Sequence, residues 1–219
     1  MLTRFERISA LTAAVLAVAL WIVGLVVTQA LTTGLSDKAT DAQVLAWVRG
    51  NKNPILTGSW LFMIGCLAFV WFAGVLRSRL AAAEAGDRTL STIAFAGAVM
   101  AAAFGIAGQS DIASAINADS VSAATAGTLH RGGDLMFVGS ELSIVLLLGA
   151  VAVLAFRTAV VPRWWGILGA LVAVVALVGP IGWAALIFGL PVWTLVTAGL
   201  LARAPRGRLA RTAATAATA

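Results

Sequence analysis

The chain has few of the side chains on which much protein chemistry depends. Among its 219 residues there is one cysteine, one histidine and no tyrosine, and charged residues make up only 11%. The single cysteine, Cys66, excludes an intrachain disulfide and a thiol redox pair. The single histidine, His130, excludes a haem held by two histidines of one chain. The scarcity of charge excludes an ordinary soluble domain, which carries about 25% charged residues.

Apolar residues, in contrast, are abundant and make up 61% of the chain. A membrane-spanning helix needs about 20 mostly apolar residues. Six segments meet this requirement, at about 9–30, 55–76, 91–111, 135–156, 164–181 and 184–202. The sequence therefore predicts an all-α, polytopic transmembrane bundle of six helices. We expect a single domain over residues 1–211 and a disordered tail at 212–219.

Basic residues predict the orientation of this bundle, because loops rich in lysine and arginine stay in the cytoplasm. Eleven basic residues fall on one side of the six segments: Arg4, Arg7, Arg77, Arg79, Arg88, Arg157, Arg163, Arg203, Arg206, Arg208 and Arg211. Four fall on the other side: Lys38, Arg49, Lys52 and Arg131. Both termini are therefore predicted to be cytoplasmic. The net charge of +6 then reflects topology, and we expect no nucleic-acid partner. The arginine-rich, alanine-rich composition indicates a bacterial cytoplasmic (inner) membrane.

The connections and packing follow from local patterns. Residues 32–54 predict a short helix at the outer membrane interface, anchored by Trp47. Residues 112–133 predict an outer loop that contains a helical turn and then His130. In the third span, Gly97, Ala101 and Gly105 recur every four residues, which favours close packing against the neighbouring helices, with dimerisation as the alternative. Pro191 predicts a kink in the last span.

Glu141 is the one acidic residue clearly inside a predicted span. A charged group at the bilayer centre costs about 2.5–3.5 kcal/mol, so such residues face the bundle, find a partner or become neutral. Asp134 precedes it by two helical turns on the same face, and Asp111 ends the third span. We take Glu141, Asp134 and Asp111 as candidate catalytic residues. The alternative is that Glu141 only hydrogen-bonds to a neighbouring helix or extends its side chain outward to the membrane surface.

Trp21, Trp60 and Trp193 lie at mid-depth or in the outer halves of their spans. Each alone fits packing against lipid, and together with Glu141 they fit the wall of a ligand pocket. Aromatic faces can stabilise a cation, and an apolar pocket with one acid suits an amphiphile. The candidate ligand-binding residues are Trp21, Trp60, Trp193, Gln109 and Ser140. No nucleotide loop, metal motif or nucleophile elbow is present, so we expect no cofactor and no metal. The expected partners are membrane lipids and a hydrophobic or amphiphilic small molecule, and the oligomeric state is left open.

Two functions fit this pattern. The first is an intramembrane enzyme that acts on a lipid-like or isoprenoid substrate by general acid catalysis, as in terpene cyclisation. A carboxyl group in an apolar pocket stays protonated near neutral pH, as an acid catalyst requires. The alternative is a non-enzymatic membrane protein: a small transporter, a lipid-binding sensor or a subunit of a larger complex. A transporter usually shows internal repeats, and we find no convincing repeat.

One passage resembles a known family. It comprises L-H-R-G-G at 129–133, F-V-G at 137–139, L-L-L-G at 146–149 and F-R-T-A-V-V-P-R-W-W-G at 156–166. These motifs resemble an uncharacterised bacterial six-helix integral-membrane family, a domain of unknown function. The inner turn is matched by Phe156, Arg157, Pro162, Arg163 and Gly166, and the family's outer histidine by His130. The resemblance implies the six-helix architecture and supplies no activity.

Overall fold

The computed structural model describes residues 4–30, 34–36, 38–84, 86–158 and 160–203. Within these residues the chain is all-helical and has no strand. Five of the described helical segments are long and apolar enough to cross a membrane, and the fold is that of a multi-pass membrane protein. The tail at 212–219, predicted to be disordered, lies outside the described residues.

The helices follow the predicted spans, with differences in length. The long helices are α1 (Arg4–Ala30), α3 (Lys52–Ala83), α4 (Thr89–Ala107) and α6 (Ala123–Arg157). The fifth segment long enough to cross a membrane is Gly182–Arg203, with 22 residues, and α9 (Leu190–Arg203) is its last part. The segment predicted as a fifth span at 164–181 forms α7 (Arg163–Ala176), which has only 14 residues. At a rise of 1.5 Å per residue α7 is about 21 Å long, shorter than the hydrocarbon core of about 30 Å.

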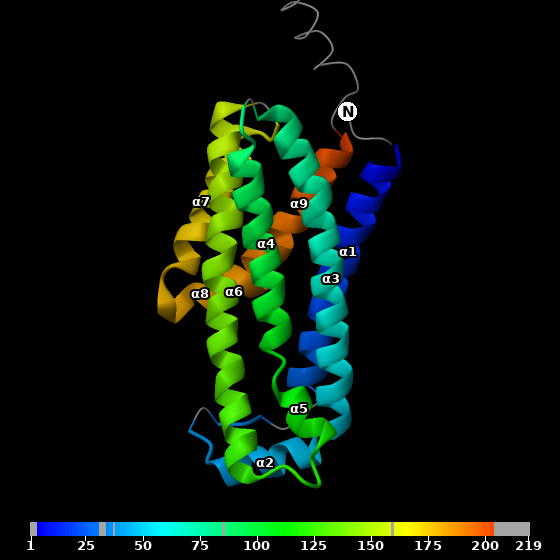
Figure 1. Ribbon diagram of the computed structural model, residues 1–219, viewed down its shortest axis with the longest axis vertical. Coiled ribbons are helices and arrows are strands. Elements are labelled where there is room, and N and C mark those ends of the chain that lie inside the picture. The colour runs from blue at the N-terminus through cyan, green and yellow to red at the C-terminus, as the bar shows by residue number, and fades with distance from the viewer. Residues whose placement is uncertain (1–3, 31–33, 37, 85, 159, 204–219) are drawn as a thin grey trace, which may run out of the picture.

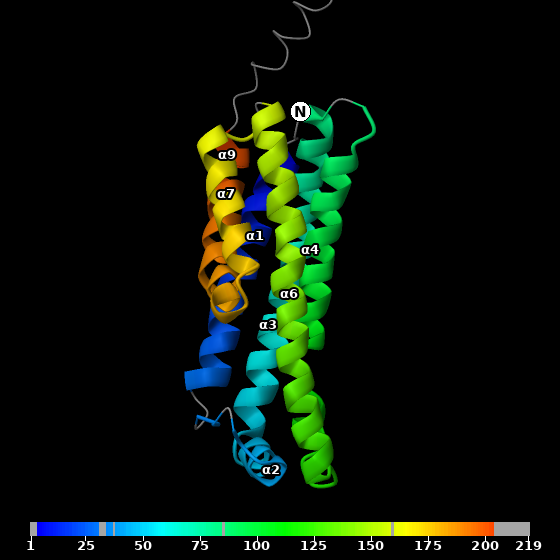
Figure 2. The ribbon, with the colours of Figure 1, turned by 90° about the vertical axis from the view of Figure 1, so that its left-hand side faces the viewer.

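The long helices pack side by side in chain order. α1 lies against α3, α3 against α4, α4 against α6, and α6 against α7, while α9 returns to α1. The indole N–H of Trp165 on α7 donates to the hydroxyl of Thr197 on α9 at 2.9 Å. Arg4 and Arg203 lie at one end of the bundle, and α2 (Asp41–Gly50) and α5 (Asp111–Ile116) lie at the other (Figures 1 and 2). We call the latter the α2–α5 end.

Glycine allows the backbones of paired helices to approach closely. A Cβ atom on Gly58 of α3 would lie 2.7 Å from the carbonyl oxygen of Gly24 on α1. A Cβ atom on Gly97 of α4 would lie 2.7 Å from the Leu147 amide nitrogen and 2.9 Å from the Ser143 carbonyl oxygen, both on α6. Small residues give this contact in membranes because lipid offers no hydrophobic drive for helix association. The small-residue stripe of α4 therefore packs within the chain.

The chain between α7 and α9 is not a regular helix. It contains η1 (Gly179–Ile181), α8 (Gly182–Ala184) and a π-helical turn, η2 (Ala185–Gly189). Two prolines explain the break, since proline has no amide hydrogen and cannot bond to the carbonyl four residues earlier. Pro180 follows the last residue of α7 by four positions, and Pro191 falls just after the π-helical turn. The sequence predicted a kink at Pro191, and the helix is irregular there: the π-helical turn lies just before the proline.

The α2–α5 end is more helical than the sequence indicated. Ser122 accepts a hydrogen bond from the Thr125 amide and starts α6 at Ala123, so His130 lies on a helix and not in the predicted loop. Thr40 and Gln43 form a capping box that starts α2. This helix is the short one predicted within residues 32–54. Val44 and Val48 of α2 are buried against α3, α5 and α6, so its apolar face covers protein.

The close contact at Gly97 makes a testable prediction. Gly97→Ala forces the backbones of α4 and α6 apart and should cost about 1–3 kcal/mol of unfolding free energy, the usual cost of overpacking. Gly149→Ala is the matched control, because nothing lies within 4 Å of a Cβ atom at that position of α6. It should be neutral or stabilising by up to about 1 kcal/mol. Unfolding titrations in detergent measure both, and equal stability of the two variants would contradict this packing.

Candidate functional site

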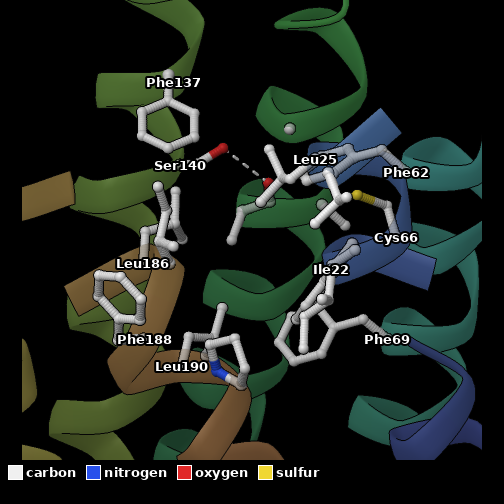
Figure 3. Close-up of a pocket in the computed structure, with 17 residues that line it drawn as sticks. Ile22, Leu25, Phe62, Cys66, Phe69, Phe137, Ser140, Leu186, Phe188 and Leu190 are labelled. Atoms are coloured by element: carbon white, nitrogen blue, oxygen red, sulfur yellow. Dashed lines mark hydrogen bonds between the residues drawn. The ribbon is translucent and has the colours of Figure 1, made fainter. Parts of the chain in front are cut away.

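A cavity of about 320 Å³ lies inside the bundle between α1, α3, α4, α6, η2 and α9. This volume is at the lower end of the range of about 300–1,000 Å³ for small-molecule sites. Side chains from α3, α6, η2 and α9 point into a common space in Figure 3. The α4 wall at Ala101, Ala102 and Gly105 and the α6 wall at Phe137 and Ser140 place the cavity in the half of the bundle nearer the α2–α5 end.

The walls of this cavity are almost wholly apolar. Phe62 and Phe69 come from α3, Phe137 from α6 and Phe188 from η2, and Trp21 of α1 adds an indole. The polar groups of the lining are few: the hydroxyl of Ser140 donates to the Ala101 carbonyl at 3.0 Å, and the thiol of Cys66 is buried (Figure 3). Such a surface can hold a hydrocarbon chain by shape and dispersion contacts, and it offers little for charge.

Glu141 lies next to this cavity without lining it. Its side chain is 5% exposed and lies against Gly182, where a Cβ atom would be 2.7 Å from Oε2. The neighbouring hydroxyl groups do not donate to its carboxyl group, because Ser140 donates to the Ala101 carbonyl and Ser143 to the Gly139 carbonyl. Among the described residues no hydrogen bond or ion pair reaches the Glu141 carboxyl group.

Asp111, predicted to share a site with Glu141, has a different partner. Its Oδ2 lies 2.9 Å from Nδ1 of His130 on α6. The ring of Trp47 meets the ring of His130 edge-on, with centroids 5.9 Å apart. His130 precedes Glu141 by eleven residues of one helix, which is about 16 Å along the axis. The structure therefore brings Asp111 to His130 at the α2–α5 end and leaves Glu141 apart.

The other candidates are scattered. Trp21 and Ser140 lie in the cavity wall. Trp193 is buried, with 2% exposed, and lines a separate, more open groove between α7, η2 and α9. Trp60 is 57% exposed, and Asp134 is also exposed. Gln109 is partly buried in the turn between α4 and α5. Within the described chain, no three His, Cys, Asp or Glu residues gather as a metal site would require.

Sequence reasoning missed most of the cavity wall. Phe62, Phe69, Phe137 and Phe188 lie in apolar stretches where a phenylalanine facing lipid and one facing a cavity have the same pattern. The small residues of α4 could have indicated the cavity. A glycine either allows a neighbouring helix to approach closely or, when large side chains lie opposite, leaves a space between the helices. A Cβ atom on Gly105 would have only ordinary contacts, 3.4 Å or more from its nearest neighbours.

Fold and site together define a multi-pass membrane protein with an internal apolar cavity. No family model matches the chain, and no curated protein or solved structure matches it. Membership of the six-helix family that residues 129–166 resemble therefore stays a prediction.

The separation of the carboxyl groups can be tested by a double-mutant cycle. Asp111→Asn and Glu141→Gln should change the unfolding free energy additively, within about 0.5 kcal/mol, because sites more than about 10 Å apart do not couple. Asp111→Asn and His130→Gln, which remove the two sides of one contact, should show a coupling of about 0.5 kcal/mol or more. Unfolding titrations in detergent give all the values. Coupling of Asp111 to Glu141 instead of His130 would restore the predicted acidic cluster.

Proposed function

We propose that this protein binds one apolar chain of a lipid or isoprenoid inside the membrane. The observation that carries the proposal is the cavity of about 320 Å³, with its phenylalanine-rich wall, in the interior of a bundle of apolar helices. Three of the lining side chains are exposed at the surface of the bundle: Ile22 and Val26 of α1 and Phe188 of η2. A chain can therefore enter sideways from the bilayer.

The affinity of this site has to come from shape. A lipid tail is as apolar as the cavity wall, so transfer from bilayer to cavity gains little from the hydrophobic effect. Dispersion contacts with a closely fitting wall remain, and each is small until many are summed. The rings of Phe62, Phe69 and Phe137 supply a rigid surface for them. This favours one bound chain of defined length or branching over bulk phospholipid.

The arrangement of polar groups supports binding over catalysis. General acid catalysis needs the acid within hydrogen-bond reach of the substrate. The carboxyl group of Glu141 lies against Gly182 and is absent from the described cavity lining. Ser140 donates to a backbone carbonyl. The non-enzymatic alternative, a lipid-binding sensor or a subunit of a larger complex, is therefore our first proposal, and terpene-cyclase-type chemistry at Glu141 is second to it.

We further propose that both termini are cytoplasmic and that α7 with η1 forms a short sixth crossing. Eight described arginines belong to the end of the bundle opposite α2 and α5: Arg4, Arg7, Arg77, Arg79, Arg88, Arg157, Arg163 and Arg203. Four basic residues belong to the α2–α5 end: Lys38, Arg49, Lys52 and Arg131. By the positive-inside rule the arginine-rich end faces the cytoplasm. In a bacterium the membrane concerned is the inner membrane.

Filling the cavity tests the binding proposal. In Gly105→Leu the new side chain starts at ordinary contact distance and extends into the cavity, so a co-purified apolar ligand should be lost. Gly149→Leu places the same side chain in open space on α6 and should keep it. Native mass spectrometry of the detergent-purified proteins, with quantitative lipid extraction, measures the ligand per chain. Equal occupancy in the two variants, or wild-type protein that carries only bulk phospholipid, would refute the proposal.

A further inference from the structure

Beyond the apolar cavity, the buried carboxyl group of Glu141 has a second acceptor beside it. A Cβ atom on Gly182 would lie 2.7 Å from Glu141 Oε2 and 3.0 Å from the carbonyl oxygen of Ala176. Both oxygens therefore border the same point. Ala176 is the last residue of α7, so its carbonyl points out of the end of a helix, where the partial charge is negative.

The carbonyl of Ala176 has lost its helical donor. In a continuous helix the amide of residue 180 would donate to it, and residue 180 is a proline, which has no amide hydrogen. The nearby amides donate elsewhere: Leu177 to Val174, Val178 to Val175, Ile181 to Val178 and Gly182 to Gly179. Among the described residues, therefore, the Glu141 carboxyl group and the Ala176 carbonyl oxygen border the same point with no hydrogen-bond donor between them.

Two acceptors in this position need a positive charge. A buried carboxylate without a partner is too costly in an apolar environment, so such a group either takes up a proton or binds a cation. Broken membrane helices bind Na⁺ or protons in this way, with unwound carbonyls and the C-terminal ends of half-helices as ligands. The elements packed around Glu141 supply no charge of their own. α4 has no titratable side chain, and none occurs between Trp164 and Ala202. On α6 the nearest is Asp134, about 10 Å away along the axis.

We propose that Glu141 and the Ala176 carbonyl form a site for a small monovalent cation, Na⁺ or a proton, at the break between α7 and α8. Gly182 leaves the space for it, since a methyl group there would meet both oxygens. The site is distinct from the apolar cavity, because Glu141 is not among the cavity-lining residues described.

The test is labelling with dicyclohexylcarbodiimide, an apolar reagent that reacts with protonated carboxyl groups in membranes. The carboxyl oxygen bonds to the central carbon of the reagent and the proton moves to a reagent nitrogen, so the protein gains the mass of one reagent. Peptide mass spectrometry locates the adduct on the purified full-length protein. We expect labelling at Glu141 that slows as pH rises, and no adduct at this position in Glu141→Gln.

Sodium distinguishes the two cations. If the site takes Na⁺, sodium chloride at fixed pH should slow the labelling of Glu141 while the same concentration of choline chloride does not. If it takes only a proton, both salts act alike and the pH dependence alone remains. Either result supports the site. Labelling that responds to neither pH nor sodium, or no labelling of Glu141 at any pH without sodium, would overturn it.

Two glycine variants on the broken segment test the geometry. Gly182→Ala should shift the pH or sodium midpoint of labelling by about tenfold, the factor that corresponds to about 1.4 kcal/mol. Gly179→Ala is the matched control, since nothing lies within 4 Å of a Cβ atom there, and it should titrate like wild type. Equal midpoints in the two variants would show that the oxygens beside Gly182 are not the site. If Gly182→Ala fails to fold, the wild-type titration with pH and sodium decides alone.

Discussion

Close backbone contact at glycine is the constraint on which this bundle depends. Lipid gives helices no hydrophobic reason to associate, so the contact has to come from packing. Gly58 against Gly24 joins α3 to α1, and Gly97 against Leu147 joins α4 to α6. These contacts fix two helix pairs at short distance. The same small-residue stripe of α4 ends at Gly105, which faces the cavity. The stripe of small residues on α4 thus gives close helix contact at Gly97 and leaves space for the cavity at Gly105.

Hydropathy predicted the helical class because apolar length is what a bilayer requires. It located helix ends less well. Residues 123–134 contain alanine, glycine and several polar groups, so their hydropathy is low although they form the first turns of α6. The sequence also overestimated α7, since residues 177–181 are apolar enough for a span. There the backbone chemistry of Pro180, and not the apolar composition, sets where the helix ends.

The site was less predictable than the fold because hydropathy does not say which way a helix faces. Trp21 and Trp60 have similar apolar surroundings in the sequence, yet Trp21 is 7% exposed and Trp60 57%. The same limit applies to carboxyl groups. Asp111 was predicted to join Glu141 because it ends the third span on the outer side, where the fourth span, which carries Glu141, begins. α6 begins at Ala123, twelve residues before the predicted span, and its first turns bring His130 to Asp111 at 2.9 Å. Hydropathy did not indicate these turns, so it could not indicate the contact.

The irregular segment between α7 and α9 contributes both to the wall of the apolar cavity and to the surroundings of the Glu141 carboxyl group. Non-helical backbone at membrane depth is tolerated where protein covers it or where it lines a cavity. Leu186 and Phe188 of η2 line the cavity, and Gly182 of α8 lies against Glu141. The chain segment that lines the cavity thus directly follows the segment that borders the proposed cation site. If a ligand in the cavity displaces η2 and so moves Gly182, the two sites are coupled, and such coupling is reciprocal: whatever the apolar chain does to the affinity for the cation, the cation does to the affinity for the chain.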